Sequence, residues 1–393
     1  MKASTGDADG QRDRLSALFD ALADADRRTI LSRLREAAPD PVGRDALATT
    51  LAGAGPDGSS DGDRKGALIA LSHRHLPKLE DAGLVTREGD AVALASHPAF
   101  EDPGVGAVVD GDASVEASSL DALFRALANG RRRAVLDALS HQHRSVHLET
   151  LARDLAADEP ASAPDAFPSD VDAVAAALHH RHLPVLRRAD LVEYDAEAET
   201  VGYRGHPELR VSWTHSEFGQ DFVAGLTDSP TDAEVWKLEG RETVVSCGQT
   251  LFERAEDELF LLFTETGLLE AGCMSRVRQA AERGVDVYLG TADPTVREFV
   301  REEAPGVTLW EPETNWLDLP VDERNVGRLV FADREAVMIG TLGERTDGGE
   351  HRERAIFGAN ADNTLVVLVR QLLGSQFGTV EATADAAEAE LSL

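Results

Sequence analysis

The sequence predicts a multidomain protein, with two copies of a small α+β module followed by one α/β domain. Two blocks near the start recur about a hundred residues later in the same order. In each copy, stretches of helical spacing precede short alternating stretches, the order of a winged helix-turn-helix module. After Asp232, strand and helix patterns alternate, which predicts a sheet covered by helices. A length of 393 residues suits two or three domains.

The internal repeat is the most specific of these observations. LSALFDALADADRRTILSRLREA at Leu15–Ala37 returns as LDALFRALANGRRRAVLDALSHQ at Leu120–Gln142, 105 residues later. LSHRHLPKLEDAGLVTREGD at Leu71–Asp90 returns as LHHRHLPVLRRADLVEYDAE at Leu178–Glu197, 107 residues later. Two blocks matched in order and spacing indicate a duplication. We therefore expect winged-helix domains over residues 1–110 and 111–210.

Each copy predicts the same elements in the same order. Two amphipathic helices open it, followed by a third, which we place at Arg44–Leu51 and Leu148–Ala156. A longer helix (Leu68–Ala82 in the first copy) ends near Gly83 or its counterpart Asp190, residue types that suit a helix C-terminus. The alternating stretches that follow, Leu84–Ala95 and Leu191–Gly205, predict two-stranded wings.

Two strings within this pattern resemble a known family. LFRALANGRRRAVLDAL is similar to the opening of ArsR-type winged-helix repressors, and HLPKLEDAGLV is similar to their recognition helix running into the wing. HHRHLP and HRHLPK also resemble a winged-helix module common in halophilic archaea. The resemblance covers about half the chain and implies double-stranded DNA as the partner.

A helical wheel of the longer helix separates a buried face from an exposed one. With Leu79 facing inward, Leu68, Ser72 and Leu76 also face inward, and His75 and its counterpart His182 lie at the core edge as hydrogen-bonded histidines. Arg74 and Arg181 point outward, whereas Pro77 and Pro184 predict a bend. The basic side chains of this face and the wing are our candidates for DNA contacts, unless the face is merely solvated: His73, Arg74, Lys78, Arg87, His180, Arg181, Arg187, Arg188 and Arg204. His73 and His75 project in nearly opposite directions, so we expect no metal site.

The charge balance is unusual. Formal net charge is −32, and only four lysines accompany the arginines, a composition similar to that of proteins from salt-in halophiles. An ordinary acidic protein with GC-rich codons is the alternative. Residues 1–110 and 111–210 each carry a net −6, whereas residues 211–393 carry −20. At molar salt the screening length is only about 3 Å, so this net charge opposes DNA binding weakly.

The C-terminal part, residues 211–380, is expected to be an α/β effector domain for ligand binding or dimerisation. Strands are predicted at Glu234–Leu238, Glu258–Phe263, Val285–Leu289, Val307–Trp310, Gly327–Ala332 and Ala336–Ile339. Helices are predicted at Arg241–Glu256, Leu268–Arg283, Thr295–Glu303 and about Thr364–Gln376. The acidic tail 381–393 is expected to be disordered.

Three strings of this domain, VWKLEGRETVV, LFERAEDELFLLFTE and RGVDVYLGT, resemble the effector domain of TrmB-type regulators, which has a phospholipase-D-like fold. The catalytic motif of that superfamily is His-x-Lys-x4-Asp, followed by a glycine. Counting back from Asp333 places Val326 at the histidine and Arg328 at the lysine, with Gly340 at the glycine. Without the nucleophilic histidine no phosphoenzyme can form. The resemblance therefore implies a domain that binds rather than reacts, and we expect no enzyme activity and no cofactor.

Ligands of α/β sheets usually bind at the carboxyl ends of the strands. Candidate residues for a small effector such as a sugar or sugar phosphate are Glu265, Thr266, Thr291, Asp293, Trp310, Trp316, Arg328 and Asp333, although each could be an ordinary loop residue. Cys247 and Cys273 are expected to be packing residues in a reducing, cytoplasmic protein. The first residues contain no apolar signal segment, and no run is long enough for a membrane helix.

Together these features predict a DNA-binding transcriptional regulator with a ligand-sensing C-terminal domain, and they leave open a homodimer formed through that domain. The net −6 on each module supports an alternative, a protein-interaction adaptor whose winged helices do not bind DNA. A hydrolase acting through the C-terminal domain is disfavoured by the missing histidine.

Overall fold

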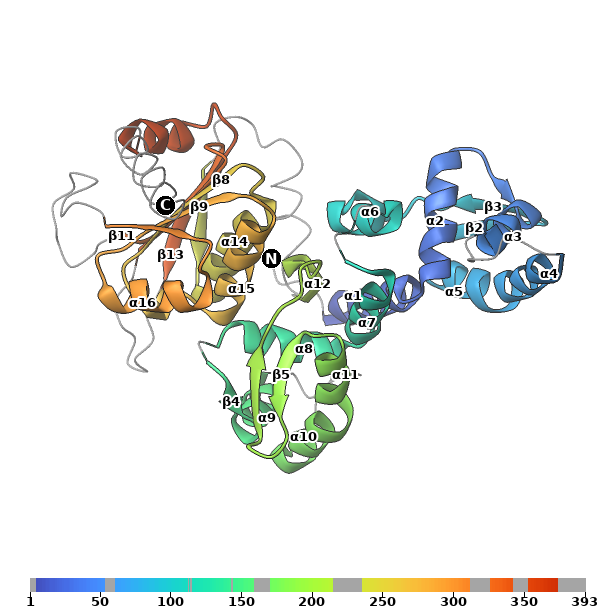
Figure 1. The fold of residues 1–393 in the computed structure, drawn as a ribbon, viewed down its shortest axis with the longest axis horizontal. Coiled ribbons are helices and arrows are strands. Elements are labelled where there is room, and N and C mark those ends of the chain that lie inside the picture. The colour runs from blue at the N-terminus through green and yellow to red at the C-terminus, as the bar shows by residue number, and fades with distance from the viewer. Residues whose placement is uncertain are drawn as a thin grey trace, which may run out of the picture. The chain divides into compact units, whose positions relative to one another are not determined.

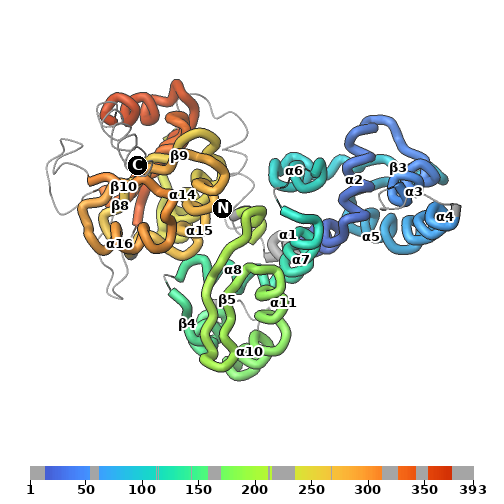
Figure 2. The backbone as a smooth tube through the Cα atoms, viewed as in Figure 1, coloured from blue at the N-terminus to red at the C-terminus, as the bar shows by residue number. Residues whose placement is uncertain are grey.

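A computed structural model describes residues 5–53, 61–111, 113, 115–142, 144–158, 170–214, 235–311, 326–341 and 353–373. The chain forms two compact units. Unit 1 contains the first copy and most of the second, and consists of residues 1–138, 146–202 and 206–217. Unit 2 contains the C-terminal residues from 218 onward, with the short segments 139–145 and 203–205. Figures 1 and 2 show the elements of each unit.

The first copy confirms the expected order of helices and hairpin. It consists of α1 (Thr5–Leu22), α2 (Ala25–Ala37), β1 (Val42–Gly43), α3 (Arg44–Gly53), α4 (Asp61–Ala70), a π-helical turn η1 (Leu71–His75), α5 (Leu76–Asp81), β2 (Val85–Glu88) and β3 (Ala91–Leu94). The three strands form an antiparallel sheet in the order β1-β3-β2. The sequence had not indicated β1, because a two-residue strand has no periodicity.

The second copy repeats this arrangement. It contains α7 (Ala117–Leu127), α8 (Gly130–Ser140), β4 (Val146–His147), α9 (Leu148–Asp158), α10 (Val171–Ala177), the π-turn η3 (Leu178–His182), α11 (Leu183–Arg188), β5 (Val192–Asp195) and β6 (Thr200–Tyr203). Its strand order, β4-β6-β5, matches that of the first copy. The short elements η2 (Pro98–Glu101) and α6 (Pro103–Asp110) link the copies, and α12 (Val211–Thr214) follows the second.

A π-helical turn precedes each mid-helix proline and changes which side chains are buried. In the first copy the Leu76 N–H donates to the Leu71 carbonyl, five residues back, just before Pro77. The wider turn shifts the helical phase, so Leu71 and His75 are fully buried. The expected inward positions Leu68 and Ser72 are only half-buried, which corrects the helical wheel.

The two copies pack against each other through equivalent helices, α1 and α7 (Figure 1). The rings of Phe19 and Phe124, equivalent residues, stack with centroids 6.0 Å apart. Arg28 donates to Asp121 at 2.8 Å, and its equivalent Arg133 donates to Ser16, the equivalent of Asp121, at 3.2 Å. Each copy thus uses the same surface towards the other, as the two subunits of a symmetric dimer do.

Unit 2 contains a seven-stranded sheet in the order β10-β9-β8-β11-β12-β13-β7. Its strands are β7 (Trp236–Glu239), β8 (Glu258–Phe263), β9 (Asp286–Gly290), β10 (Thr308–Trp310), β11 (Val326–Ala332), β12 (Ala336–Thr341) and β13 (Arg354–Ala359). Strands β8, β9 and β10 are parallel, whereas β11 runs antiparallel to β8. Strand β13, which lies between β12 and β7, was not predicted.

Helices cover both faces of this sheet (Figure 1). On one face, α14 (Arg241–Arg254), α15 (Ala271–Glu282) and α16 (Pro294–Glu303) pack on the alternate β8 residues Leu259, Leu261 and Phe263. On the other, the helix over residues 364–373 packs on Phe260 and Leu262. This alternation confirms the expected sheet between helices. Cys247 and Cys273 are buried and unpaired, as expected of packing residues.

The C-terminal tail and the absence of a membrane helix were also predicted. The tail 381–393 lies outside the described residues. Among the residues that are described, no helix is both long and apolar enough to cross a membrane.

Candidate nucleic-acid interface

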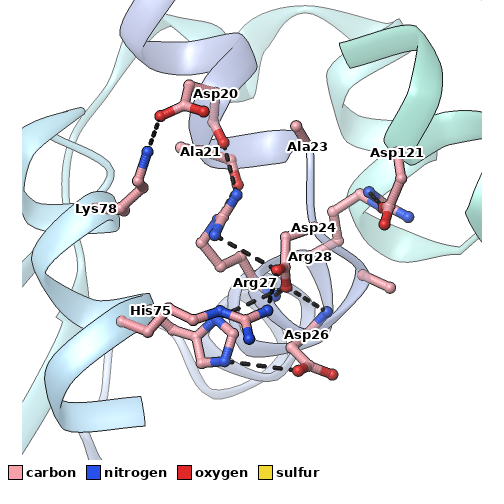
Figure 3. A network of polar contacts seen from close by, with 12 residues as sticks. Asp20, Ala21, Ala23, Asp24, Asp26, Arg27, Arg28, His75, Lys78 and Asp121 are labelled. Atoms are coloured by element: carbon pink, nitrogen blue, oxygen red, sulfur yellow. Dashed lines mark hydrogen bonds and ion pairs between the residues drawn. The ribbon is translucent and has the colours of Figure 1, made fainter. Parts of the chain in front are cut away.

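Three outward cations of the first copy, Arg74, Lys78 and Arg87, are each held in an ion pair. Arg74, on the π-turn, donates to Asp24 at 2.6 Å. Lys78, one turn later, forms a short ion pair with Asp20 (Figure 3). On the wing, Arg87 pairs with Glu80 at 3.1 Å. Thus Arg74, Lys78 and Arg87 are exposed as predicted, but each has a carboxylate beside it.

Asp24 organises this network. It is the N-cap of α2, and its carboxylate accepts from the backbone N–H groups of Asp26 and Arg27. Burial would raise the pKa of Asp24, but the hydrogen bond from Arg74 and the charge of Arg27 outweigh burial and hold the pKa below its usual range. The carboxylate therefore stays ionised, and it fixes Arg74 against the start of α2.

His75 is fully buried beside the same carboxylates. Its Nδ1 lies 3.7 Å from Asp24 and its Nε2 lies 3.5 Å from Asp26, which is farther than in a good hydrogen bond. The prediction that His75 is hydrogen-bonded is therefore wrong. Burial is the main cause of its lowered pKa, so the ring is neutral. Atoms of Asp24, Asp26 and His75 lie within 4.8 Å of one another, the spacing of metal ligands. Because Arg74 and Arg27 already balance the charge of Asp24, we interpret this cluster as an ion-pair network.

The second copy surrounds its equivalent histidine with arginines instead. Burial, followed by the charges of Arg132, Arg131 and Arg181, lowers the pKa of His182 to about 4. Arg181, Arg187 and Arg188 are exposed, and no ion pair involves any of the three in the described part of the chain. The outward positions predicted for Arg181, on η3, and Arg188, on α11, are therefore confirmed, and here the cations face solvent.

A surface hollow of about 480 Å³ adjoins these arginines. It lies between α11 and β5 and is lined by His179, Pro184, Arg187, Arg188, Tyr194 and Ala196. A short hydrogen bond joins His179 to the Tyr194 hydroxyl across this hollow. Most of the surface that lines this hollow is apolar, so Arg187 and Arg188 are the lining groups that could meet an anionic group such as a phosphate.

The other candidates for DNA contacts are His73, His180 and Arg204. His73 and His180 are exposed at equivalent positions beside the π-turns. Arg204 is exposed after β6, and its backbone carbonyl accepts from Ser275 at 3.1 Å within unit 2. Arg204 thus belongs to unit 2, and its role as a DNA contact of the wing stays a prediction.

The C-terminal candidates do not all share one edge of the sheet. Arg328 lies opposite Phe263, near the carboxyl end of β8. Asp333 accepts backbone hydrogen bonds from residues 256–258, at the amino end of that strand. Because β11 is antiparallel to β8, the two residues lie at opposite edges, and the prediction that Asp333 joins Arg328 is wrong.

Several of the other candidates have packing or capping roles. Trp310 is buried, with its ring against Phe260 and close to Gly290, so it has no exposed face on which a sugar ring could stack. Thr291 is buried, and Asp293 caps α16 by accepting from the Thr295 N–H at 2.7 Å. Glu265 is exposed and Thr266 half-buried at the carboxyl edge, whereas Trp316 lies outside the described residues.

A buried charge network, which the sequence did not indicate, fixes Arg328. Its guanidinium donates to Glu353 at 2.6 Å, and both side chains are almost fully buried. Arg241 donates to the other oxygen of Glu353 at 2.6 Å and to Glu270 at 2.8 Å. These residues are up to 112 positions apart in sequence, so no local pattern could have shown the pairing.

Comparisons with known proteins support the duplication. One family, described as a domain of unknown function (DUF7344), matches twice, at residues 19–93 and 124–202. The internal repeat is therefore confirmed, whereas the ArsR resemblance stays a prediction. No curated protein matches the chain.

Solved structures show low overall similarity. A phospholipase D family member from Salmonella typhimurium aligns with 37% of this chain and 94% of its own at 15% identity and a TM-score of 0.28. The archaeal chromatin protein TrmBL2, described as showing a novel mode of DNA binding, aligns with 64% of this chain and 92% of its own at 12% identity and 0.26. Polyphosphate kinase from Porphyromonas gingivalis aligns with 92% of this chain and 69% of its own at 11% and 0.25. TM-scores this low do not decide a fold or a function.

Proposed function

We propose that the protein is a DNA-binding transcriptional regulator whose tandem modules are winged helix-turn-helix domains. The observation that supports this most strongly is the exposed arginine face of the second copy. Arg181, on η3, and Arg188, on α11, are exposed on the helical segment that leads into the hairpin of β5 and β6. A helix with outward arginines at this place is the element that such modules insert into the major groove.

The C-terminal unit is proposed to regulate rather than to catalyse. Val326 occupies the position at which the phospholipase D motif has its nucleophilic histidine. Arg328, at the lysine position of that motif, forms a buried ion pair with Glu353. A guanidinium held in a buried ion pair is poorly placed to stabilise a transferring phosphoryl group. Glu265 and Thr266 remain accessible for a small polar effector, and a homodimer formed through this unit is part of the same proposal.

Binding of the full-length chain to labelled genomic DNA fragments, measured across a range of KCl concentrations, tests the DNA-binding proposal. Affinity should fall linearly with salt on logarithmic axes, with a slope set by the number of phosphates contacted. Binding that is absent even at the lowest salt at which the protein stays folded would favour the adaptor instead. Co-purification of a protein partner would then be the expected result.

A further inference from the structure

The two copies carry opposite charge at matched positions around the outward helix face. At the first block, Asp20, Asp24 and Asp26 of the first copy are replaced by Arg125, Asn129 and Arg131 in the second. At the second block, Glu80 and Asp81 are replaced by Arg187 and Arg188. We compared nine positions of the first copy with their counterparts in the second copy. In the first copy they hold five acidic and four basic residues, whereas in the second they hold six basic and no acidic residues. The first-copy positions are Asp20, Asp24, Asp26, Arg27, Arg74, Lys78, Glu80, Asp81 and Arg87.

In the first copy the acidic residues are the partners of the predicted DNA contacts. Asp24 holds Arg74, and Glu80 holds Arg87. Asp20 holds Lys78 (Figure 3). To reach a phosphate, Arg74 would have to exchange one ion pair for another. The carboxylate left behind would then repel the same phosphate, so little net counterion release would remain to drive binding.

In the second copy the corresponding positions offer no such partner. Asn129 replaces Asp24 and caps α8 in the same way, its side chain accepting from the Arg132 N–H at 3.2 Å. The cap is thus kept while the negative charge is lost. Arg181, the counterpart of Arg74, is exposed and forms no ion pair with any described residue. Arg187 is within electrostatic reach of Asp195, and Arg188 lines the hollow beside α11.

We propose that the second copy alone supplies the phosphate contacts to DNA, and that Asp20 and Asp24 hold the equivalent face of the first copy neutral. This inference rests on the proposed DNA-binding function and specifies which surface performs it. The first copy then contributes chiefly through packing, since α1 and α7 form the interface between the copies. A single chain presents one DNA-reading face.

Matched double variants of the full-length protein test the proposal, with a short DNA duplex of mixed sequence as the probe and fluorescence anisotropy as the readout. Arg181→Ala with Arg188→Ala should weaken binding by at least tenfold and make the logarithmic salt slope shallower by about two, one per lost phosphate contact. Arg74→Ala with Lys78→Ala, which removes the same number of cations from the first copy, should change affinity by less than about twofold.

A variant that should bind DNA more tightly tests whether Asp20 and Asp24 neutralise Arg74 and Lys78 or only stabilise the fold. Asp20→Asn with Asp24→Asn should release Arg74 and Lys78, tighten binding and make the salt slope steeper, while the asparagine introduced at the N-cap keeps the helix cap. Circular dichroism would verify that each variant is folded. An equal loss from both alanine pairs, or an unchanged slope after the two asparagine substitutions, would overturn the inference and leave the proposed function standing. Failure of the wild type to bind at any salt would overturn both.

Discussion

Glu353 is the centre of the buried charge network, and replacing it by glutamine should destabilise unit 2 strongly. Its carboxylate neutralises Arg328, whose side chain is 4% exposed, and accepts a second bond from Arg241. Glutamine keeps nearly the same shape but removes the negative charge, which leaves the Arg328 guanidinium buried without compensation. Breaking a buried pair from one side costs about 3–5 kcal/mol, because the desolvation of the remaining charge is no longer offset.

Urea unfolding at constant KCl concentration measures this cost. With a urea dependence of about 1–3 kcal/mol per molar, the unfolding midpoint should fall by roughly 1–5 M. Tryptophan fluorescence is a suitable signal, because Trp236 and Trp310 both lie in this unit. The same change at the surface, Glu149→Gln, is the matched control. Its partner Arg153 is 59% exposed, so its loss should cost less than about 1 kcal/mol.

A compensating variant tests the reason for the loss. Arg328→Met combined with Glu353→Gln removes the charge that the single variant leaves uncompensated, so most of the stability should return. Arg241 retains Glu270 in either variant. A loss in Glu353→Gln no larger than in Glu149→Gln, or no recovery in the double variant, would refute the account of the network as a balanced buried charge.

Three further predictions follow from the packing and from the environment of His182. Phe124→Ala should cost about 3–5 kcal/mol in urea unfolding by leaving a cavity against Phe19, and adding Phe19→Ala should cost less than a second independent loss, since the rings touch. Gly290→Ala should cost about 1–3 kcal/mol, because a Cβ there would lie 2.5 Å from the Trp310 ring, whereas Gly66→Ala, with nothing within 4 Å, should be neutral or stabilising. His182 has a folded pKa of about 4 against an unfolded value of 6.5, so its stability contribution is complete above pH 6.5 and is lost as pH falls towards 4, by about 1.4 kcal/mol per unit. His182→Gln should flatten the pH dependence of the unfolding free energy in that window, and profiles of equal slope would contradict the assignment.

Local pattern accounts for much of what the sequence predicted. Helices α14, α15 and α16 and strands β8 to β12 lie where the periodicity placed them, because amphipathic spacing is set by the residues of each element alone. Strand β13 was missed even though its sequence, RAIFGA, alternates in burial. The phase of the outward helix was misjudged because a π-turn, for which the sequence has no regular signal, sits before Pro77 and Pro184.

The sequence by itself determined the duplication, the order of elements in each copy and the exposed arginines of the second copy, since all of these are written in neighbouring residues. Only the tertiary structure decided which cations of the two copies are paired with a carboxylate and which are available to bind a phosphate. Asp24 and Arg74 are 50 positions apart, and their ion pair exists because the start of α2 packs beside η1. Likewise, the antiparallel pairing of β11 with β8 placed Asp333 away from Arg328. Charge acts through space rather than along the chain, so the neutral face and the basic face became distinguishable only after the chain had folded.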